Sequence, residues 1–299
     1  MTETYSHILT LIASRQGCLT EQICKDSANL LSQSDLNLQW LRNATACDIT
    51  LTITDKAKAD QVLRPYLSIH AIDFFIQKPK NRRKKILLAD MDSTIVTSET
   101  LDDLAEFAGL GEQVSSITAR AMNGELDFEA ALNERVSMLK GLSQEMLGQA
   151  YQLIKITPGA NVLVNTMTGN GAYCALVSGG FRFFTSRIKQ RLGFDVDFSN
   201  DFIIENGQLT GDVVKPILGK TAKLETLKKL ANEQSIDLSQ TLTVGDGAND
   251  LAMIQAAGLG VAYHGKPIVT AHATHRVDHG DLSALLYAQG YRFEDFTGH

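Results

Sequence analysis

Short apolar runs that end in small or acidic residues restrict the fold of this chain more than any other feature. Three such runs occupy Ile86–Ala89, Ala172–Val177 and Leu242–Val244, and Leu259–Tyr263 has the same apolar character. A strand that is apolar at every position is covered on both faces, which is typical of a parallel sheet. Helical stretches such as residues 221–233 would supply the crossovers. The sequence therefore predicts an α/β fold with a Rossmann-like parallel sheet.

Two stretches interrupt the alternation of strand and helix. Residues 100–153 lie between the first two predicted strands and are mostly helical, and they are far too long for one crossover helix. We therefore expect an inserted helical cap there. Residues 202–213 carry the pair Asn206-Gly207 between two strand-like runs. This pair is a strong hairpin signal and predicts a second, smaller insertion.

The first 77 residues have a different pattern and suggest a separate unit. Strand-like and helical segments alternate in the order 6–14, 20–31, 45–53, 57–67 and 71–76. This order predicts a small α+β unit of the ferredoxin type in which one strand is short or missing. With 299 residues, the chain is long enough for two domains of about 100–200 residues each.

A basic run separates the two units. Six of the eight residues from 78 to 85 are Lys or Arg. A nucleic-acid patch is one interpretation, but a short run in a chain of net charge −6 is a weak electrostatic footprint. We therefore interpret residues 78–85 as a solvated linker between a domain of residues 1–77 and a larger domain of residues 86–299, and we expect no nucleic-acid partner.

The composition predicts an ordinary globular protein. Apolar residues make up 44% and charged residues 21% of the chain. No apolar run approaches the roughly 18 residues of a membrane span, and the N-terminus lacks the basic start of a signal peptide. We expect a cytoplasmic protein without a membrane partner. No CxxC spacing is present, so reduced thiols are expected at Cys18, Cys24, Cys47 and Cys174.

Residues that can bind metal or phosphate follow three of the predicted strands. The carboxyl ends of parallel strands meet at one edge of the sheet, where ligands bind. Asp90 and Asp92 occupy alternate positions after the first strand, so both carboxylates point into one space. The second strand ends in a hydroxyl and two glycines, Ser178, Gly179 and Gly180. The third strand is followed by two carboxylates and an amide, Asp246, Asp250 and Asn249, and the helix before it carries Lys223.

This set of groups fits phosphoryl transfer. Clustered carboxylates repel one another, and a hard divalent cation such as Mg²⁺ holds them ionised together. Lysine, hydroxyl and backbone N–H groups bind the oxygens of a phosphoryl group. Taken singly, each motif could be a turn or a solvated surface. Together, at three strand ends, they predict magnesium-dependent phosphoryl transfer with an aspartate nucleophile.

The motifs resemble those of the haloacid dehalogenase superfamily, and more closely those of its phosphoserine phosphatases. They are DMDST at 90–94, SGG at 178–180, Lys223 and GDGAND at 245–250, and the resemblance runs from about residue 85 to 296. It implies a haloacid dehalogenase-type sheet with a helical cap. It also implies hydrolysis of O-phospho-L-serine to L-serine and phosphate through an aspartyl phosphate, the last step of serine biosynthesis.

The resemblance assigns a role to each strand-end carboxylate. Asp90 would be the nucleophile, and Asp92 would protonate the leaving serine oxygen and then deprotonate the attacking water. Mg²⁺ would be held by the Asp90 and Asp246 carboxylates and the backbone carbonyl of Asp92. Asp250 would support the metal site without being a direct ligand.

Four further groups would hold the phosphoryl oxygens or lie beside them. The resemblance assigns this role to Ser178, the backbone amide of Gly179, and Lys223, with Asn249 nearby. A helical lysine is more often solvated, and Ser-Gly-Gly is more often a plain loop. The joint occurrence of these groups at successive strand ends favours the phosphate site.

The cap would select the ester. L-Phosphoserine carries an ammonium and a carboxylate besides its phosphate, and an acidic residue with an arginine is the smallest complementary set. By resemblance, Glu99 would meet the ammonium and Arg135 the carboxylate, while Met122 and Phe128 would shield the site from water. The alternatives are a surface i,i+4 pair for Arg135 and plain cap core for Met122 and Phe128.

The N-terminal pattern is similar to that of an ACT domain but carries no diagnostic ligand motif. A packing or dimerisation module, which would make the chain a homodimer, is favoured over a serine sensor. Two rival functions stay open. One is a phosphatase or phosphotransferase acting on another small phosphate ester. The other is a catalytically idle amino-acid sensor or nucleic-acid-binding protein, which is disfavoured because every catalytic position holds a competent residue.

Overall fold

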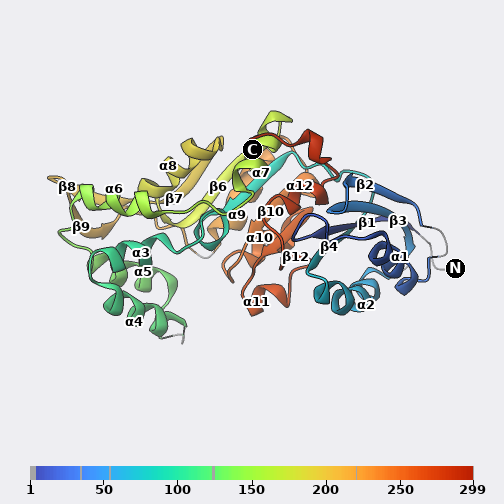
Figure 1. Cartoon of the computed structure of the whole chain (residues 1–299). Helices are drawn as coiled ribbons and strands as arrows, with labels where there is room; N and C mark the ends of the chain where they lie inside the picture. The colour runs from blue at the N-terminus through green and yellow to red at the C-terminus, as the bar shows by residue number, and fades with distance from the viewer. Residues whose placement is uncertain (1–4, 34–35, 54, 123–124, 220, 299) are drawn as a thin grey trace.

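The computed structural model describes residues 5–33, 36–53, 55–122, 125–219 and 221–298. Its centre is a six-stranded, fully parallel sheet in the order β12-β11-β10-β5-β6-β7 (Figure 1). The predicted α/β fold class is therefore confirmed. The strands are β5 (Ile86–Asp90), β6 (Tyr173–Phe181), β7 (Val196–Asn200), β10 (Thr241–Gly245), β11 (Leu259–Tyr263) and β12 (His275–Val277).

Helices cover both faces of this sheet. In β5, Leu87 and Ala89 join one buried cluster, whereas Ile86 and Leu88 join another on the opposite face. This two-sided burial is the reason that the strand is apolar at every position. The first cluster includes α7 (Ala160–Gly169), α8 (Arg182–Leu192) and α12 (Ala284–Ala288), and the second includes α9 (Ala222–Glu233) and α10 (Leu251–Ala256).

Two insertions interrupt the alternation of sheet strands and helices. One follows β5 and is called the cap below, and the other follows β7. Among the described residues, four helices lie between η1 (Met91–Ile95), the turn after β5, and α7: α3 (Thr100–Phe107), α4 (Gly111–Met122), α5 (Phe128–Ser137) and α6 (Gln144–Leu153). A hairpin of β8 (Phe202–Glu205) and β9 (Gln208–Val213) lies against α5 and α6 (Figure 1). Asn206 and Gly207 at its tip have φ values of 49° and 76°, the left-handed pair that a tight hairpin turn requires.

The N-terminal residues form a second, antiparallel sheet in the order β2-β3-β1-β4. Its elements are β1 (Tyr5–Ala13), α1 (Glu21–Leu30), β2 (Leu38–Arg42), β3 (Ala46–Ile53), α2 (Lys56–Ile69) and β4 (Ile72–Gln77). The strand that sequence analysis expected to be short or missing is β2. It is a five-residue edge strand with mixed burial, so it lacks the alternation of buried and exposed positions that marks the second half of β3.

The basic run at residues 78–85 is exposed at six of its eight positions, but Arg82 and Lys84, which were also expected to be solvated, are half-buried and buried. The Arg82 guanidinium donates to both carboxylate oxygens of Asp48, at 2.6 and 2.9 Å, and to the backbone carbonyl of Ala288. Lys84 is only 7% exposed, and its ammonium donates to two backbone carbonyls. Arg82 therefore ties the N-terminal sheet to the end of α12, and Lys84 ties the run to the backbone of Ser239.

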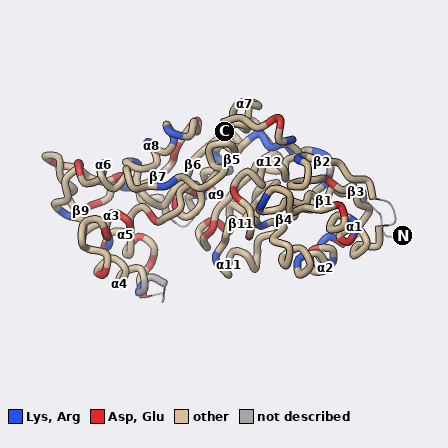
Figure 2. The backbone as a smooth tube through the Cα atoms, in the orientation of Figure 1, with Lys and Arg blue, Asp and Glu red and all other residues tan. Residues whose placement is uncertain are grey.

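Charges of both signs are interspersed along the backbone (Figure 2). Over the part of the chain that the structure describes, none of the helices combines the length and the apolar character needed to cross a membrane.

Candidate active site

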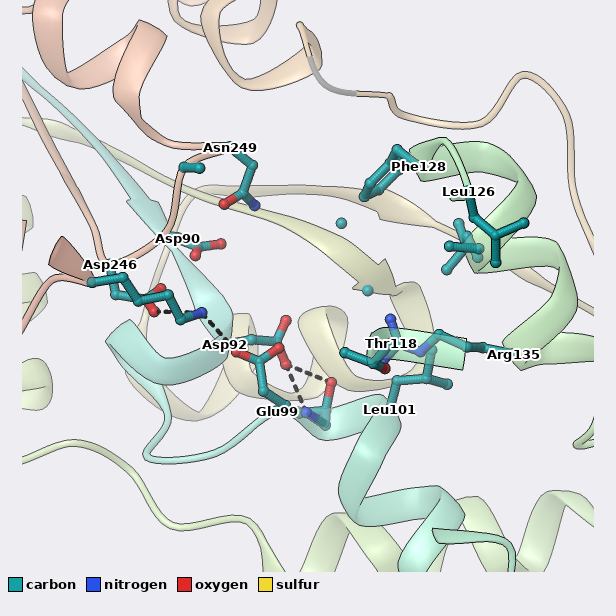
Figure 3. A pocket seen from close by; sticks show the side chains of 17 residues that line it. Asp90, Asp92, Glu99, Leu101, Thr118, Leu126, Phe128, Arg135, Asp246 and Asn249 are labelled. Carbon is teal, nitrogen blue, oxygen red and sulfur yellow. Dashed lines mark hydrogen bonds and ion pairs between the residues drawn. The ribbon is translucent and has the colours of Figure 1, made fainter. Parts of the chain in front are cut away.

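A cavity of about 500 Å³ lies between the carboxyl ends of the parallel strands and the cap. Figure 3 shows its two walls: Asp90, Asp92 and Asp246 lie on one side, and Phe128 and Arg135 come from the cap on the other. Strand ends and cap helices that are distant in sequence thus enclose one space. We call these two sides the core wall and the cap wall.

Asp90 ends β5 and is a buried carboxylate of the core wall. Its Oδ1 pairs with the Lys223 ammonium at 2.6 Å and accepts from the Met91 N–H at 2.9 Å. Lys223 lies on α9, is 5% exposed and donates to Asp250 at 2.6 Å. Burial and the nearby Asp250 raise the pKa of Asp90 well above its ordinary value, and Lys223 opposes this shift. Burial alone would lower the pKa of Lys223. The Asp90 and Asp250 carboxylates more than offset this effect, so the pKa of Lys223 is raised and the ammonium stays charged.

Asp92 is held between the sheet and the first cap helix. The chain leaves β5 through the turn η1 (Met91–Ile95), where Ser93 has a φ of 54°. The Asp92 Oδ1 accepts from the N–H and the hydroxyl of Thr100, at 2.8 and 2.7 Å, and its Oδ2 accepts from the Ser178 hydroxyl at 2.7 Å. Ser178 in turn accepts from the Gly180 N–H at 2.7 Å. Both Asp92 oxygens are thereby held in a fixed orientation. The Ser178 hydroxyl that donates to Oδ2 could instead donate to a bound phosphoryl group.

Three buried carboxylates can hold a cation. Oxygens of Asp90, Asp246 and Asp250 lie within 4.8 Å of one another, and the three residues are at most 6% exposed. Burial raises the pKa of Asp246, as it does for Asp90. Asp250 already accepts from Lys223 and from the Gly247 N–H at 2.9 Å. The donor set therefore fits a divalent cation, with Asp90 and Asp246 better placed to ligate it than Asp250.

Glu99 and Arg135 line this cavity from different elements. Glu99 directly precedes α3, and its carboxylate accepts from the Ser93 hydroxyl at 2.9 Å. Partial desolvation and the nearby Asp92 raise the pKa of Glu99. Arg135 lies on α5 and donates to Asp102 of α3 at 2.5 Å. Because its partner lies on another helix, the alternative of a surface i,i+4 pair does not hold for Arg135.

The remaining predicted residues also fall at this cavity, with one outside the described part. Phe128 begins α5 and faces Gly179, where an added Cβ would approach its ring at 3.3 Å. Asn249 lines the same cavity. Met122 ends α4, but its side chain lies outside the described residues.

Two residues that contact the strand-end carboxylates of this site were not predicted from the sequence. Thr100 is the first residue of α3 and binds Asp92, a contact that depends on how the cap folds back onto the sheet. Lys266 follows β11, and its ammonium lies 3.2 Å from Asp246. The second residue could have been found, because the rule that ligands bind at the carboxyl ends of parallel strands applies to this fourth strand as well.

Comparison with known proteins agrees with this arrangement. The model of the haloacid dehalogenase-like hydrolases matches residues 87–255, and the chain belongs to this family. The family predicted from the motifs is therefore confirmed.

Within that family, the chain is similar to phosphoserine phosphatases. One from Archaeoglobus fulgidus is 41% identical over 226 residues, which are 76% of this chain and 62% of that longer protein. A solved phospho-aspartyl intermediate analogue of a phosphoserine phosphatase is 42% identical, with a TM-score of 0.64, covering 69% of this chain and 98% of that one. A haloacid dehalogenase-family hydrolase from Salmonella enterica serovar Typhi has a TM-score of 0.86 at 30% identity, covering 95% and 98% of the two chains. The last likeness includes the N-terminal sheet.

Proposed function

We propose that this chain is a magnesium-dependent phosphoserine phosphatase. The observation that carries the proposal is that Glu99 and Arg135 line the same cavity as the Asp90 carboxylate. A phosphate, an ammonium and a carboxylate on one small molecule would each meet a group of opposite charge or a phosphate-binding set there. The similarity to phosphoserine phosphatases supports the same substrate.

The reaction would proceed in two displacements at phosphorus. An Asp90 oxygen attacks phosphorus, the bond from phosphorus to the serine oxygen breaks, and Asp92 gives its proton to that oxygen. Water then attacks the aspartyl phosphate, Asp92 takes a proton from the water, and phosphate leaves with Asp90 restored. Both contacts that we describe for the Asp90 carboxylate use Oδ1, so the attack is assigned to Oδ2.

The groups around Asp92 support this proton transfer. Ser178 donates to Asp92 Oδ2 at 2.7 Å, while Thr100 holds the other oxygen. When the Ser178 hydroxyl turns to a phosphoryl oxygen, Asp92 Oδ2 is released toward the leaving group. Lys223, Asn249 and the Gly179 N–H would hold the other phosphoryl oxygens.

Mg²⁺ is the cation that we assign to the acidic group. The Asp90 and Asp246 carboxylates and the Asp92 carbonyl would hold it, which fits buried carboxylates whose pKa is raised by burial. When bound, Mg²⁺ supplies positive charge against the phosphoryl oxygens and favours the ionised form of Asp90.

Phosphate release from a panel of esters tests the proposal. The panel contains O-phospho-L-serine, p-nitrophenyl phosphate, a sugar phosphate and a nucleotide, each assayed with Mg²⁺ and with a chelator. We expect the highest kcat/KM for O-phospho-L-serine and no release with the chelator. Preference for another ester would reject the roles of Glu99 and Arg135, and release that survives the chelator would reject the metal.

We propose further that residues 1–77 are a packing or dimerisation module and that residues 86–299 are the catalytic domain. We also propose that the protein is a cytoplasmic homodimer. Exposed Leu30 and Ile69 on the two N-terminal helices support an apolar contact there. Sedimentation equilibrium of the whole chain tests this: a dimer mass that falls to a monomer mass in Ile69→Lys supports it, and a monomer mass for the unsubstituted chain rejects dimerisation.

A further inference from the structure

Lys266 connects two parts of the pocket that have different proposed tasks. Its ammonium lies 3.2 Å from Asp246 Oδ2, on the core wall, and 4.0 Å from Glu99 Oε1, at the start of the cap. The side chain lines the cavity and is 54% exposed. One positive charge thus stands between a proposed metal ligand and the proposed ammonium ligand of the substrate.

The backbone fixes where this charge can be. The Lys266 N–H donates to the Asp246 carbonyl at 2.9 Å, which ties the loop after β11 to the end of β10. Pro267 follows at once and begins α11 (Pro267–Thr270), so the chain turns at Lys266. A lysine whose Cα is anchored beside Asp246 keeps its ammonium near these carboxylates, even though its tip is solvated.

The charge should act with opposite sign on the two ligands of the pocket. A cation held by Asp90 and Asp246 would be repelled by an ammonium that already contacts Asp246. A phosphate ester of net negative charge would be attracted to the same ammonium. Removal of an ordinary solvated lysine would change the binding of neither the cation nor the ester. Removal of a lysine that only braces the loop would weaken the binding of both.

We propose that Lys266 sets the balance between cation and phosphate ester in this pocket. It weakens the binding of the divalent cation and strengthens the binding of the anionic ester, and it positions Glu99 through their ion pair. The part that concerns the ester rests on the proposed function, whereas the part that concerns the cation does not.

Lys266→Gln and Lys266→Arg, with Lys229→Gln as a control, test this proposal. Lys229 is an exposed lysine on α9 whose ammonium lies 3.9 Å from Glu233. Lys229→Gln removes the same positive charge from the protein as Lys266→Gln does. Mg²⁺ affinity is measured by isothermal titration calorimetry without substrate, and kcat and KM are measured on O-phospho-L-serine. We expect Lys266→Gln to bind Mg²⁺ roughly 3- to 10-fold more tightly and to raise KM by a similar factor, with a smaller change in kcat. Lys266→Arg should resemble the unsubstituted protein.

Equal weakening of Mg²⁺ and ester binding would overturn the proposal in favour of a bracing role. No change beyond that of Lys229→Gln would overturn it in favour of a solvated lysine. If the unsubstituted chain does not hydrolyse O-phospho-L-serine at all, the proposed function and the ester part fail together. The calorimetric titration still decides the cation part.

Discussion

The two walls of the pocket differ in how their charged groups are held. On the core wall, Asp90, Lys223 and Asp250 are at most 5% exposed and are joined by contacts of 2.6 Å. On the cap wall, Arg135 is 20% exposed and its partner Asp102 is 42% exposed. These three groups of the core wall thus form a buried network of ion pairs, whereas the Arg135–Asp102 pair of the cap wall lies at the edge of solvent.

This difference separates two demands on an enzyme. Displacement at phosphorus requires charges that are fixed and desolvated before the substrate arrives, and the ends of buried parallel strands supply such positions. Selection of one ester requires groups that can be exchanged without disturbing the chemistry, and a helical insertion supplies those. Changes to the core wall should therefore abolish turnover or stability, and changes to the cap wall should alter preference.

The largest effect is expected from Asp90→Asn. An amide cannot form the aspartyl phosphate, so kcat on every ester should fall by at least about 1,000-fold. Without Mg²⁺, the Tm of Asp90→Asn should be equal to that of the unsubstituted protein or slightly higher, because the substitution removes a carboxylate whose pKa is raised by burial. Turnover near that of the unsubstituted enzyme, in protein free of contaminating phosphatase, would show that Asp90 is not the nucleophile.

Lys223→Met should damage stability and activity together. It leaves the buried Asp90 and Asp250 carboxylates without their shared cation, which should cost about 3–5 kcal/mol in the free energy of unfolding. Chemical denaturation measures this loss.

The double variant Lys223→Met/Asp250→Asn separates the two effects. Removal of one of the unpaired carboxylates should recover part of the stability, while phosphate release stays low because the lysine that would bind phosphate is still missing. Recovery of activity along with stability would mean that Lys223 only braces the core wall.

Arg135→Ala should change preference and leave the chemistry in place. Loss of a charge-assisted contact should cost roughly 2–4 kcal/mol in kcat/KM on O-phospho-L-serine, and much less on p-nitrophenyl phosphate, which lacks the carboxylate. Arg120→Ala is the matched control, because Arg120 is also a cap arginine but pairs with Glu134. An equal loss on both esters would remove Arg135 from substrate recognition.

The smallest effect is the pH dependence of stabilisation by Mg²⁺. Burial raises the pKa of Asp90 and Asp246 above their unfolded values near pH 4, so the stability that their protonated forms contribute is lost as the pH rises from there. Mg²⁺ requires the ionised forms and should stabilise more at pH 8 than at pH 5.5, by roughly 2–4 °C in Tm. Thermal unfolding with and without Mg²⁺ at both pH values measures this difference. Asp246→Asn should lose most of the shift, and an equal shift at both pH values would contradict metal binding by these carboxylates.

Much of the core wall could be predicted from the sequence alone. The rule for parallel sheets needs only the positions of strand ends, so Asp90, Asp92 and Asp246 were expected at one edge before any contact was known. Lys223 was included in the set because its helix precedes the strand that ends at Asp246, and its role came from the family resemblance. The cap residues required the resemblance altogether, because nothing local shows that an arginine of α5 faces a strand end. The structure brings the strand-end carboxylates and Arg135 to one cavity, and it places Lys223 in a small adjoining pocket that shares Phe128, Gly179 and Asn249 with that cavity.

Other features depend on tertiary contacts that no local pattern contains. Arg82 and Lys84 look solvated by charge density, yet their acceptors are Asp48 and backbone carbonyls far along the chain. The strand β2 was missed because an edge strand of mixed burial lacks a clear period. Thr100 was missed because the start of α3 meets Asp92 only once the cap has folded back.

Direct detection of the phosphoryl group on Asp90 is the most decisive single measurement. The whole chain is mixed with Mg²⁺ and O-phospho-L-serine, quenched with acid within the first turnover and digested, and its peptides are weighed by mass spectrometry. We predict that the peptide containing Asp90 gains the mass of one phosphoryl group, and that Asp90→Asn never does. Phosphate release without this adduct, or an adduct on another residue such as Ser178, would contradict the account.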